Sequence, residues 1–229
     1  MKKMTKKHLI FLIFFLGCSV FSLKAQLDKE FWFVAPKITE GHWYCPSGSP
    51  CDPSDADATI PGGEPIFFRV TTQASPAEIV ILQPAMAPND TLLKDQLNAY
   101  ETESYNLSDS IDRIENRPAY NGTPSTILEK GILLKSTDDV QAYYEVGEYF
   151  NAEIYALKGR NALGYEFYTP FQDILDNPTG DYTPEAFSKI DIVATKDGTD
   201  VRINNTAPIQ NIPSGPINVT LDKGETISL

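Results

Sequence analysis

Two phrases of this sequence occur twice, and a repeat constrains the fold of a chain more than any single motif does. The phrases are EFWFVAP (Glu30–Pro36) with its variant EFYTPF (Glu166–Phe171), and VTTQASPAEIVI (Val70–Ile81) with its variant VATKDGTDVRI (Val193–Ile203). Self-similarity of this kind indicates that one structural unit has been used twice.

The repeat also predicts the domain organisation. We expect a first β unit over residues 26–165 and a second unit over residues 166–229. Since the second copy stops at Leu229 within the alternating run LDKGETISL, we expect the second unit to be incomplete at this end.

Many segments alternate polar with β-branched or aromatic residues, a pattern typical of strands. The strands predicted in this way are residues 65–72, 77–83, 140–146, 153–157, 190–195, 200–204 and 217–221. Lys196-Asp197-Gly198 and Asp222-Lys223-Gly224 lie between short alternating runs, as hairpin turns do. The pattern predicts an all-β fold, with an antiparallel β-sandwich favoured over a closed barrel.

Helix signals are few, and the predicted loops are long. Asn106–Asn116 has Ser108 as a candidate N-cap, and Thr183–Glu185 places a cap residue before a proline, so we expect two short helices. We expect loops at residues 39–64, 84–103 and 172–184. Long loops on a β scaffold are where function is usually carried.

The first 25 residues have the pattern of a secretory signal peptide. Lys2, Lys3, Lys6 and Lys7 precede an apolar run over residues 9–23, and Ala25 supplies a small residue at the cut site. The run is shorter than the roughly 20 apolar residues of a membrane span. We expect an exported protein with no transmembrane helix in its mature chain; lipidation at Cys18 is the alternative.

The net charge of the chain limits the classes of molecule that it can bind. Five of the 19 Lys and Arg residues and none of the 31 Asp and Glu residues lie in residues 1–25, so the remainder carries 14 basic and 31 acidic residues, a net charge of −17. This field repels phosphate backbones and anionic lipid, which argues against nucleic-acid binding. Divalent cations are the natural counter-ions.

The loop at 39–64 carries most of the candidate site residues. Cys45 and Cys51, which bracket PSGSP, are predicted to form a disulfide in an exported protein. The alternative, a metal site formed by these cysteines and His42, requires a reducing compartment and a fourth ligand.

Acidic and aromatic residues beside this pair suggest two kinds of binding. The candidate calcium ligands are Asp52, Asp55 and Asp57, with Asp197 and Asp200 as a weaker second set; ordinary acidic turns are the alternative. The candidate contacts for a sugar or protein are Trp43, Tyr44 and Tyr143, and packing over the disulfide is the alternative for the first two. Tyr143 and Tyr144 are adjacent, so we expect them on opposite faces of a strand.

Catalytic patterns are mostly missing from the sequence. The mature chain has one histidine, His42, and contains neither G-x-S-x-G nor H-E-x-x-H. A glycosidase needs two carboxylates, and Glu145, Glu148 and Glu153 lie close in sequence, but acids on strands usually face solvent. We expect that the protein is not an enzyme and that it binds no cofactor other than the candidate calcium.

Four phrases carry a resemblance to a family. In order they are EFWFVAP, RIENRPA (Arg113–Ala119), VQAYYEV (Val140–Val146) and ALKGRNALGYEFYTPFQ (Ala156–Gln172). Together they resemble the N-terminal domain of IgGFc-binding proteins, in the version found in large exported surface proteins of gliding and gut-dwelling bacteria. The resemblance spans about Lys29–Leu229, and residues 43–64, with the two cysteines, depart from the family pattern.

The resemblance implies a β-rich module at the front of a long surface protein, and it supplies no catalytic residues. We expect a cell-surface binding or adhesion module whose partner is a protein or glycan on a host, a neighbouring cell or a matrix. A non-binding architectural spacer of a surface fibre is the alternative. A carbohydrate-active enzyme is the third reading.

Overall fold

The computed structural model describes residues 26–36, 66–88, 90–116, 126–147, 153–169, 189–206, 209 and 215–229. Within these ranges the regular structure is almost entirely β, and the α-helix present, α2 (Ile111–Ile114), has four residues. The all-β prediction is therefore confirmed. The predicted signal peptide, the loops at 39–64 and 172–184 and the helix at Thr183–Glu185 lie outside the described residues.

The strands form one large antiparallel sheet, with a short parallel pair at one edge, and two small two-stranded sheets. The strands of the large sheet are β1 (Asp28–Pro36), β2 (Ile66–Thr72), β3 (Ala77–Leu82), β4 (Thr91–Leu97), β5 (Thr102–Asn106), β6 (Glu115–Asn116), β7 (Gly131–Val146) and β8 (Glu153–Ala156). The small sheets contain β9 (Asp191–Val193), β10 (Thr199–Ile203), β11 (Ile217–Leu221) and β12 (Thr226–Ser228). Three 3₁₀ turns, η1 (Pro84–Met86), η2 (Ser108–Ser110) and η3 (Gly159–Ala162), complete the list.

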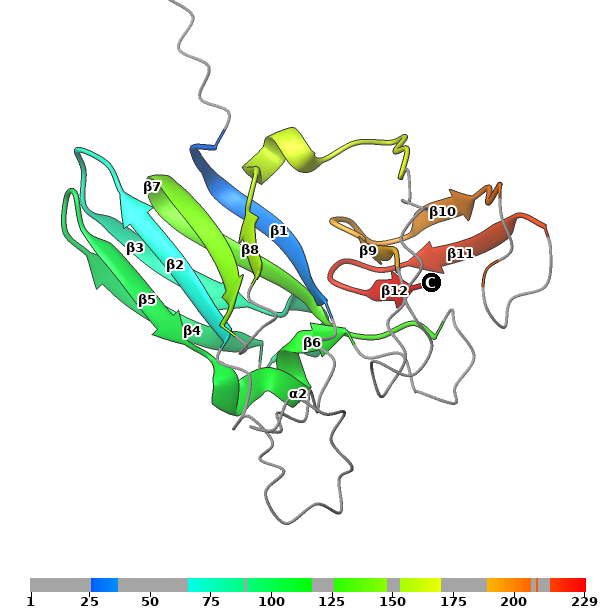
Figure 1. The fold of residues 1–229 in the computed structure, drawn as a ribbon, viewed down its shortest axis with the longest axis horizontal. Helices are drawn as coiled ribbons and strands as arrows, with labels where there is room; N and C mark the ends of the chain where they lie inside the picture. Colours follow the sequence, from blue (N-terminus) through cyan, green and yellow to red (C-terminus); the bar gives the residue numbers. More distant parts are fainter. Residues whose placement is uncertain are drawn as a thin grey trace, which may run out of the picture.

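Strand β7 organises the large sheet because it pairs with four other strands. Its first half pairs with β1 and β3, and its second half pairs with β2 and β8. Polar residues 135–139 separate the apolar halves, and the sheet curls into a half-barrel there (Figure 1). One strand thereby belongs to both leaves of the curled sheet.

The concave face of the half-barrel holds the main core. Aromatic rings from four strands meet there: Phe33 lies 4.8 Å from Tyr144 and 6.4 Å from Phe68, and Tyr144 lies 6.2 Å from Tyr155, measured between ring centroids. Tyr144 is fully buried whereas Tyr143 is only half-buried, so the adjacent tyrosines lie on opposite faces as predicted. The alternation of β7 thus decides which tyrosine builds the core.

Strands β2 to β5 form a kinked ribbon. β2 pairs with β5, and β3 pairs with β4, so each long arm of the ribbon changes direction once, at residues 73–76 and 98–101. Backbone hydrogen bonds join the two kinks: Thr72 N–H donates to the carbonyl of Glu101 at 2.9 Å, and Tyr100 N–H donates to that of Gln73 at 2.8 Å.

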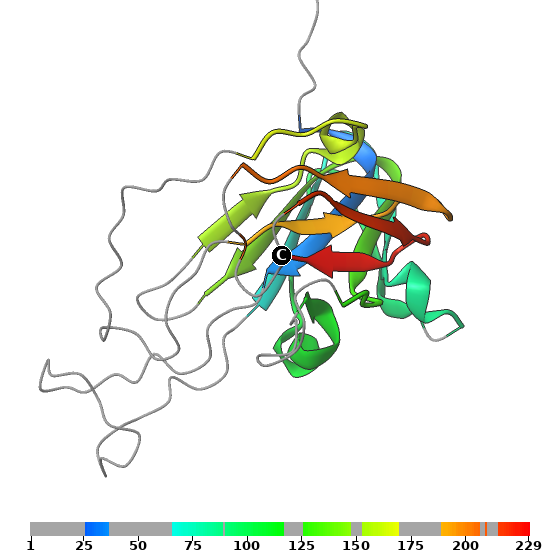
Figure 2. The same cartoon turned by 90° about the vertical axis from the view of Figure 1, so that its right-hand side faces the viewer.

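Strands β9 to β12 form a second ribbon of the same topology, visible at the right of Figure 1 and at the front of Figure 2. β9 pairs with β12, and β10 pairs with β11. The turns at Lys196–Gly198 and Asp222–Gly224 therefore join strands that do not pair, and the hairpin prediction for them is wrong. They are the two kinks of the ribbon, and each caps the other, because Asp222 accepts from Gly198 N–H and Asp197 accepts from Lys223 N–H.

The structure also corrects the loop predicted at residues 84–103. It contains β4 and the start of β5. β4 pairs only with β3 and exposes most of its side chains, so its sequence TLLKDQL lacks the apolar alternation that reveals a half-buried strand. The predicted helix at 106–116 is shorter, spanning η2 and α2, and Ser108 does not cap it but accepts a hydrogen bond from Ile66 N–H.

The second ribbon is attached to the large sheet just before β7. Leu128 and Thr226 exchange backbone hydrogen bonds of 2.9 and 2.7 Å, and Gly131 N–H donates to the carbonyl of Gly224 at 3.0 Å. A Cβ at Gly131 would lie 2.6 Å from both the Gly224 carbonyl oxygen and the Val193 side chain. This position therefore requires glycine for close packing.

We predict that Gly131→Ala loosens the second ribbon from the large sheet, because the added methyl group overlaps the backbone of Gly224. An overpacked contact of this kind costs about 1–3 kcal/mol. Hydrogen exchange should accelerate at the Thr226 amide and stay unchanged in β2. Gly198→Asn is the matched control, since no atom lies within 4 Å of its Cβ position and Asn tolerates its positive φ; equal exchange in both variants contradicts the prediction.

Candidate functional site

An exposed aromatic segment, Leu163–Thr169, follows η3. Its solvent-exposed side chains include Tyr165, Phe167 and Tyr168, whose exposed fractions are 103%, 66% and 85%. The repeat predicts a strand at EFYTPF, but residues 166–169, the described part, form none. Three exposed aromatic rings within four residues are unusual on a protein surface, since such rings are normally buried or engaged by a partner.

A polar clasp holds η3, the turn that leads into this segment, against β1. The buried carboxylate of Asp28 accepts hydrogen bonds from the Arg160 backbone N–H at 2.9 Å, from Arg160 Nε at 3.0 Å and from the Lys29 N–H at 2.7 Å. Gly159 has a φ of 57°, and a Cβ there would lie 2.4 Å from the Asp28 Cβ. The GRNALG turn therefore has a structural role: its glycine allows close approach and its arginine binds the carboxylate.

The clasp changes the acidity of Asp28 in a defined direction. Burial by itself raises the pKa of this carboxyl group, and hydrogen bonds from Arg160 and Lys29, together with the guanidinium charge, more than offset burial and lower the pKa below its ordinary value. Because the unfolded chain then takes up a proton before the folded one does, the carboxylate stabilises the fold fully at neutral pH. That contribution is lost as the pH falls below about 3.8 and through the folded pKa.

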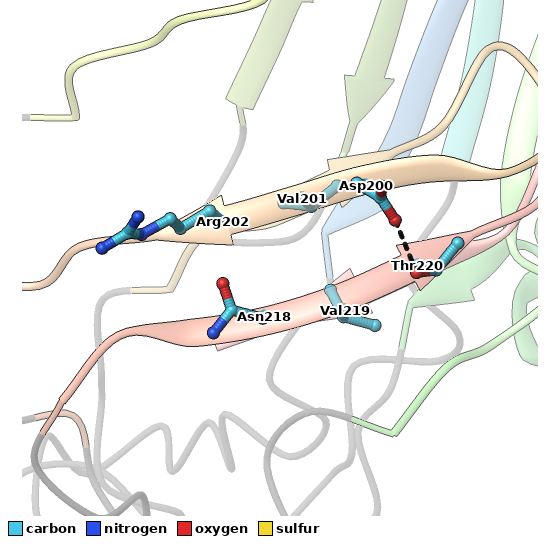
Figure 3. A pocket seen from close by; sticks show the side chains of 6 residues that line it. All are labelled: Asp200, Val201, Arg202, Asn218, Val219 and Thr220. Atoms are coloured by element: carbon cyan, nitrogen blue, oxygen red, sulfur yellow. Dashed lines mark hydrogen bonds between the residues drawn. The ribbon is translucent and has the colours of Figure 1, made fainter.

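A shallow hollow of about 350 Å³ lies on the β10–β11 sheet (Figure 3). Its lining consists of Asp200, Val201, Arg202, Asn218, Val219 and Thr220. Asp200 accepts a 2.7 Å hydrogen bond from the Thr220 hydroxyl, and Arg202 Nε donates to Asn204 at 3.3 Å. These contacts form a ladder on an exposed sheet face.

Tyr143, the candidate contact residue that the structure describes, lies on the convex face of the half-barrel. It pairs with Arg69 of β2, which binds Glu145 and donates to the Ser104 hydroxyl at 2.8 Å. Glu145 is therefore held in an ion pair, and Glu153 is exposed at the edge strand β8. In the described part of the chain, the carboxylates of Glu145 and Glu153 do not line a common cleft.

The other candidate residues lie outside the described part of the chain. These are Cys18, His42, Trp43, Tyr44, Cys45, Cys51, Asp52, Asp55, Asp57 and Glu148, so the disulfide, the calcium site and the aromatic pair stay predictions. In the ranges that the structure does describe, no three His, Cys, Asp or Glu side chains come together as metal ligands. The same ranges contain no helix with the length and apolar character to cross a membrane.

The sequence pattern does not reveal Tyr165, Phe167 and Tyr168 as surface residues. Because EFYTPF resembles EFWFVAP, whose aromatic residues lie in β1, the repeat predicts a strand over Glu166–Phe171, which includes Phe167 and Tyr168 but not Tyr165. A distinguishing signal was present, since Thr169-Pro170 follows directly, and a proline both removes a ladder donor and restricts the preceding residue.

We predict that Asp28→Asn lowers the free energy of unfolding by about 1–2 kcal/mol at pH 7, because it removes a buried charged acceptor. Urea unfolding of both proteins from pH 7 to pH 2 should show this difference shrinking as the pH falls below 3.8. Asp109→Asn, at an exposed carboxylate, is the control and should show no such trend. A difference that is constant over this pH range contradicts the assignment.

No role can be transferred to this chain from the comparisons with known proteins. Comparison of the chain with family models, curated proteins and solved structures found no match.

Proposed function

We propose that this chain is a binding module of an exported cell-surface protein and that the exposed aromatic segment is its contact surface. The observation that carries the proposal is the exposure of Tyr165, Phe167 and Tyr168 directly after the Asp28–Arg160 clasp. Export is supported by the N-terminal sequence pattern, which is that of a secretory signal peptide.

Aromatic side chains make effective contacts with proteins and sugars. They offer a large apolar area, and few rotatable bonds are immobilised when they bind. The clasp fixes the turn that leads into the segment, so part of the ordering cost of binding is met before a partner arrives. The acidic charge of the chain favours a neutral or basic partner over a nucleic acid.

We extend the proposal to the architecture of the chain and to its family. We interpret the two facing leaves of the half-barrel as a sandwich-like core and the second ribbon as part of a repeated unit. Support comes from the shared apolar interior of the leaves and the equal topology of the two ribbons. The ordered phrases from EFWFVAP to ALKGRNALGYEFYTPFQ support membership of the IgGFc-binding protein N-terminal domain family.

The second candidate function is an architectural spacer with no ligand of its own. It is favoured by the convex face of the half-barrel, where Arg69, Glu145 and Ser104 satisfy one another. The hollow on β10–β11 is likewise lined by residues that bond within the ribbon. Neither surface presents a concentration of unused binding groups.

We predict that Tyr165→Ala, Phe167→Ala and Tyr168→Ala each weaken adhesion. Truncation of an aromatic residue at the centre of a contact typically costs at least 2 kcal/mol, roughly a 30-fold loss of affinity. A glycan array and a whole-cell adhesion assay measure the effect, and thermal unfolding verifies that each variant is folded. Trp43→Ala and Tyr44→Ala test the aromatic pair of the cysteine loop in the same assays.

Tyr100→Asn provides the matched control for adhesion. Tyr100 is also a highly exposed tyrosine, but it lies in a ribbon kink, and its positive φ is tolerated by Asn. Adhesion should survive this change. Unchanged adhesion in the three segment variants and in the Trp43 and Tyr44 variants would favour the spacer instead, and release of sugar from a polysaccharide by the purified protein would favour an enzyme.

A further inference from the structure

The two kinked ribbons agree residue by residue in their second arms. The run LNAYETES (Leu97–Ser104) corresponds to LDKGETIS (Leu221–Ser228), and it forms the kink and the following strand in both ribbons. In both kinks the third residue after the leucine has positive φ, 58° at Tyr100 and 86° at Gly224. In both, the glutamate that follows accepts a hydrogen bond from the first kink residue, Asn98 or Asp222.

The first arms agree as well. Ala77 pairs with Leu97 as Thr199 pairs with Leu221, and Thr71 pairs with Thr102 as Val193 pairs with Thr226. Both first arms therefore have the same length from strand to strand, without a gap. β3 corresponds to β10, and Ile81 corresponds to Ile203.

In the first ribbon, β7 pairs with the edge of β3 that faces away from β4. Leu134 of β7 pairs with Ile81 of β3 on one side and with Phe31 of β1 on the other. The N-terminal half of β7 thus lies between β3 and the strand that contains EFWFVAP. Both of its neighbours have a counterpart in the second unit, β10 and the segment with EFYTPF.

In the second ribbon no described strand pairs with β10 on the side opposite β11. The aromatic segment passes above β10 in both views, on that same side of the ribbon (Figures 1 and 2). An unpaired strand edge presents backbone donors and acceptors that readily bind another strand. The aromatic side chains of the segment that correspond to those of β1, Phe167 and Tyr168, are solvent-exposed.

We propose that the edge of β10 and the aromatic segment together bind one extended polypeptide with the chemistry of β7. Such a partner has a run of apolar residues that can be buried on both faces, as Gly131–Leu134 are in β7, followed by a polar bend. It adds to β10 as a strand, and its apolar side chains cover Phe167 and its neighbours. This proposal rests on the proposed binding role of the segment and names the partner class as a polypeptide strand.

A peptide with the sequence of Gly131–Val146 is the probe, added to the full chain. The expected result is amide exchange about tenfold slower in β10 and in residues 165–169. When p-benzoylphenylalanine replaces Leu134 of the peptide, irradiation should label the protein near Ile203 and Phe167, the counterparts of Ile81 and Phe31. A peptide with Leu133→Pro and Tyr143→Pro is the control, since each proline removes a ladder donor, and it should give neither effect.

Two outcomes overturn the proposal. One is unchanged exchange in β10 up to the solubility limit of the peptide; the other is labelling near Ile81 and Phe31, which shows exchange with the native β7. The proposed function is judged separately by adhesion. If the segment variants lose adhesion but the peptide does not slow amide exchange, the binding role is kept and the strand partner is rejected. If the peptide slows exchange in β10 but the variants adhere as before, the strand partner is kept and the adhesive role of the segment is rejected.

Discussion

The shared register of β7 is the constraint on which the rest of the structure depends. Its first half fixes β1 and β3, and its second half fixes β2 and β8, so one strand sets the positions of both leaves. A shift by one residue would turn Tyr144 out of the core and Tyr143 into it. Residues 135–139, between the two halves, are polar, so the strand passes from one leaf of the sheet to the other at a place where no apolar side chain has to be buried.

The kinked ribbon is the element that the molecule uses twice, and the two uses have different surroundings. The first ribbon is completed by β7 and shares the main core with β1 and β7. The second has a small core of its own, Ala194, Leu221 and Ile227, and is joined to the large sheet through Leu128 and Gly131. Among the described strands one copy is completed and the other has an unpaired edge, and such an edge is suited to association, which supports a binding role over a spacer role.

Sequence patterns predicted the β class and most strands with two-sided pairing or a buried face, because apolar alternation records burial. They did not predict β1 or β5. They also failed at β4, whose KDQ side chains are exposed, and at the first half of β7, whose run GILL is buried on both faces and does not alternate. They also predicted hairpins at the two kinks of the second ribbon, since turn residues do not reveal whether the flanking strands pair. The aromatic segment was misplaced because resemblance to EFWFVAP carries no information on whether a partner strand is present, and the cysteine-loop candidates lie outside the described residues.

The Asp28–Arg160 clasp joins residues 132 positions apart in the chain. Native pairing of β1 also needs β7, so neither contact can form until most of the polypeptide is available. Contacts this distant make chain closure slow, because loop entropy must be overcome before any bond rewards it. A newly made molecule would therefore hold its first strand unpaired during synthesis, an interval in which a chaperone or an export machine has access to an extended N-terminal region.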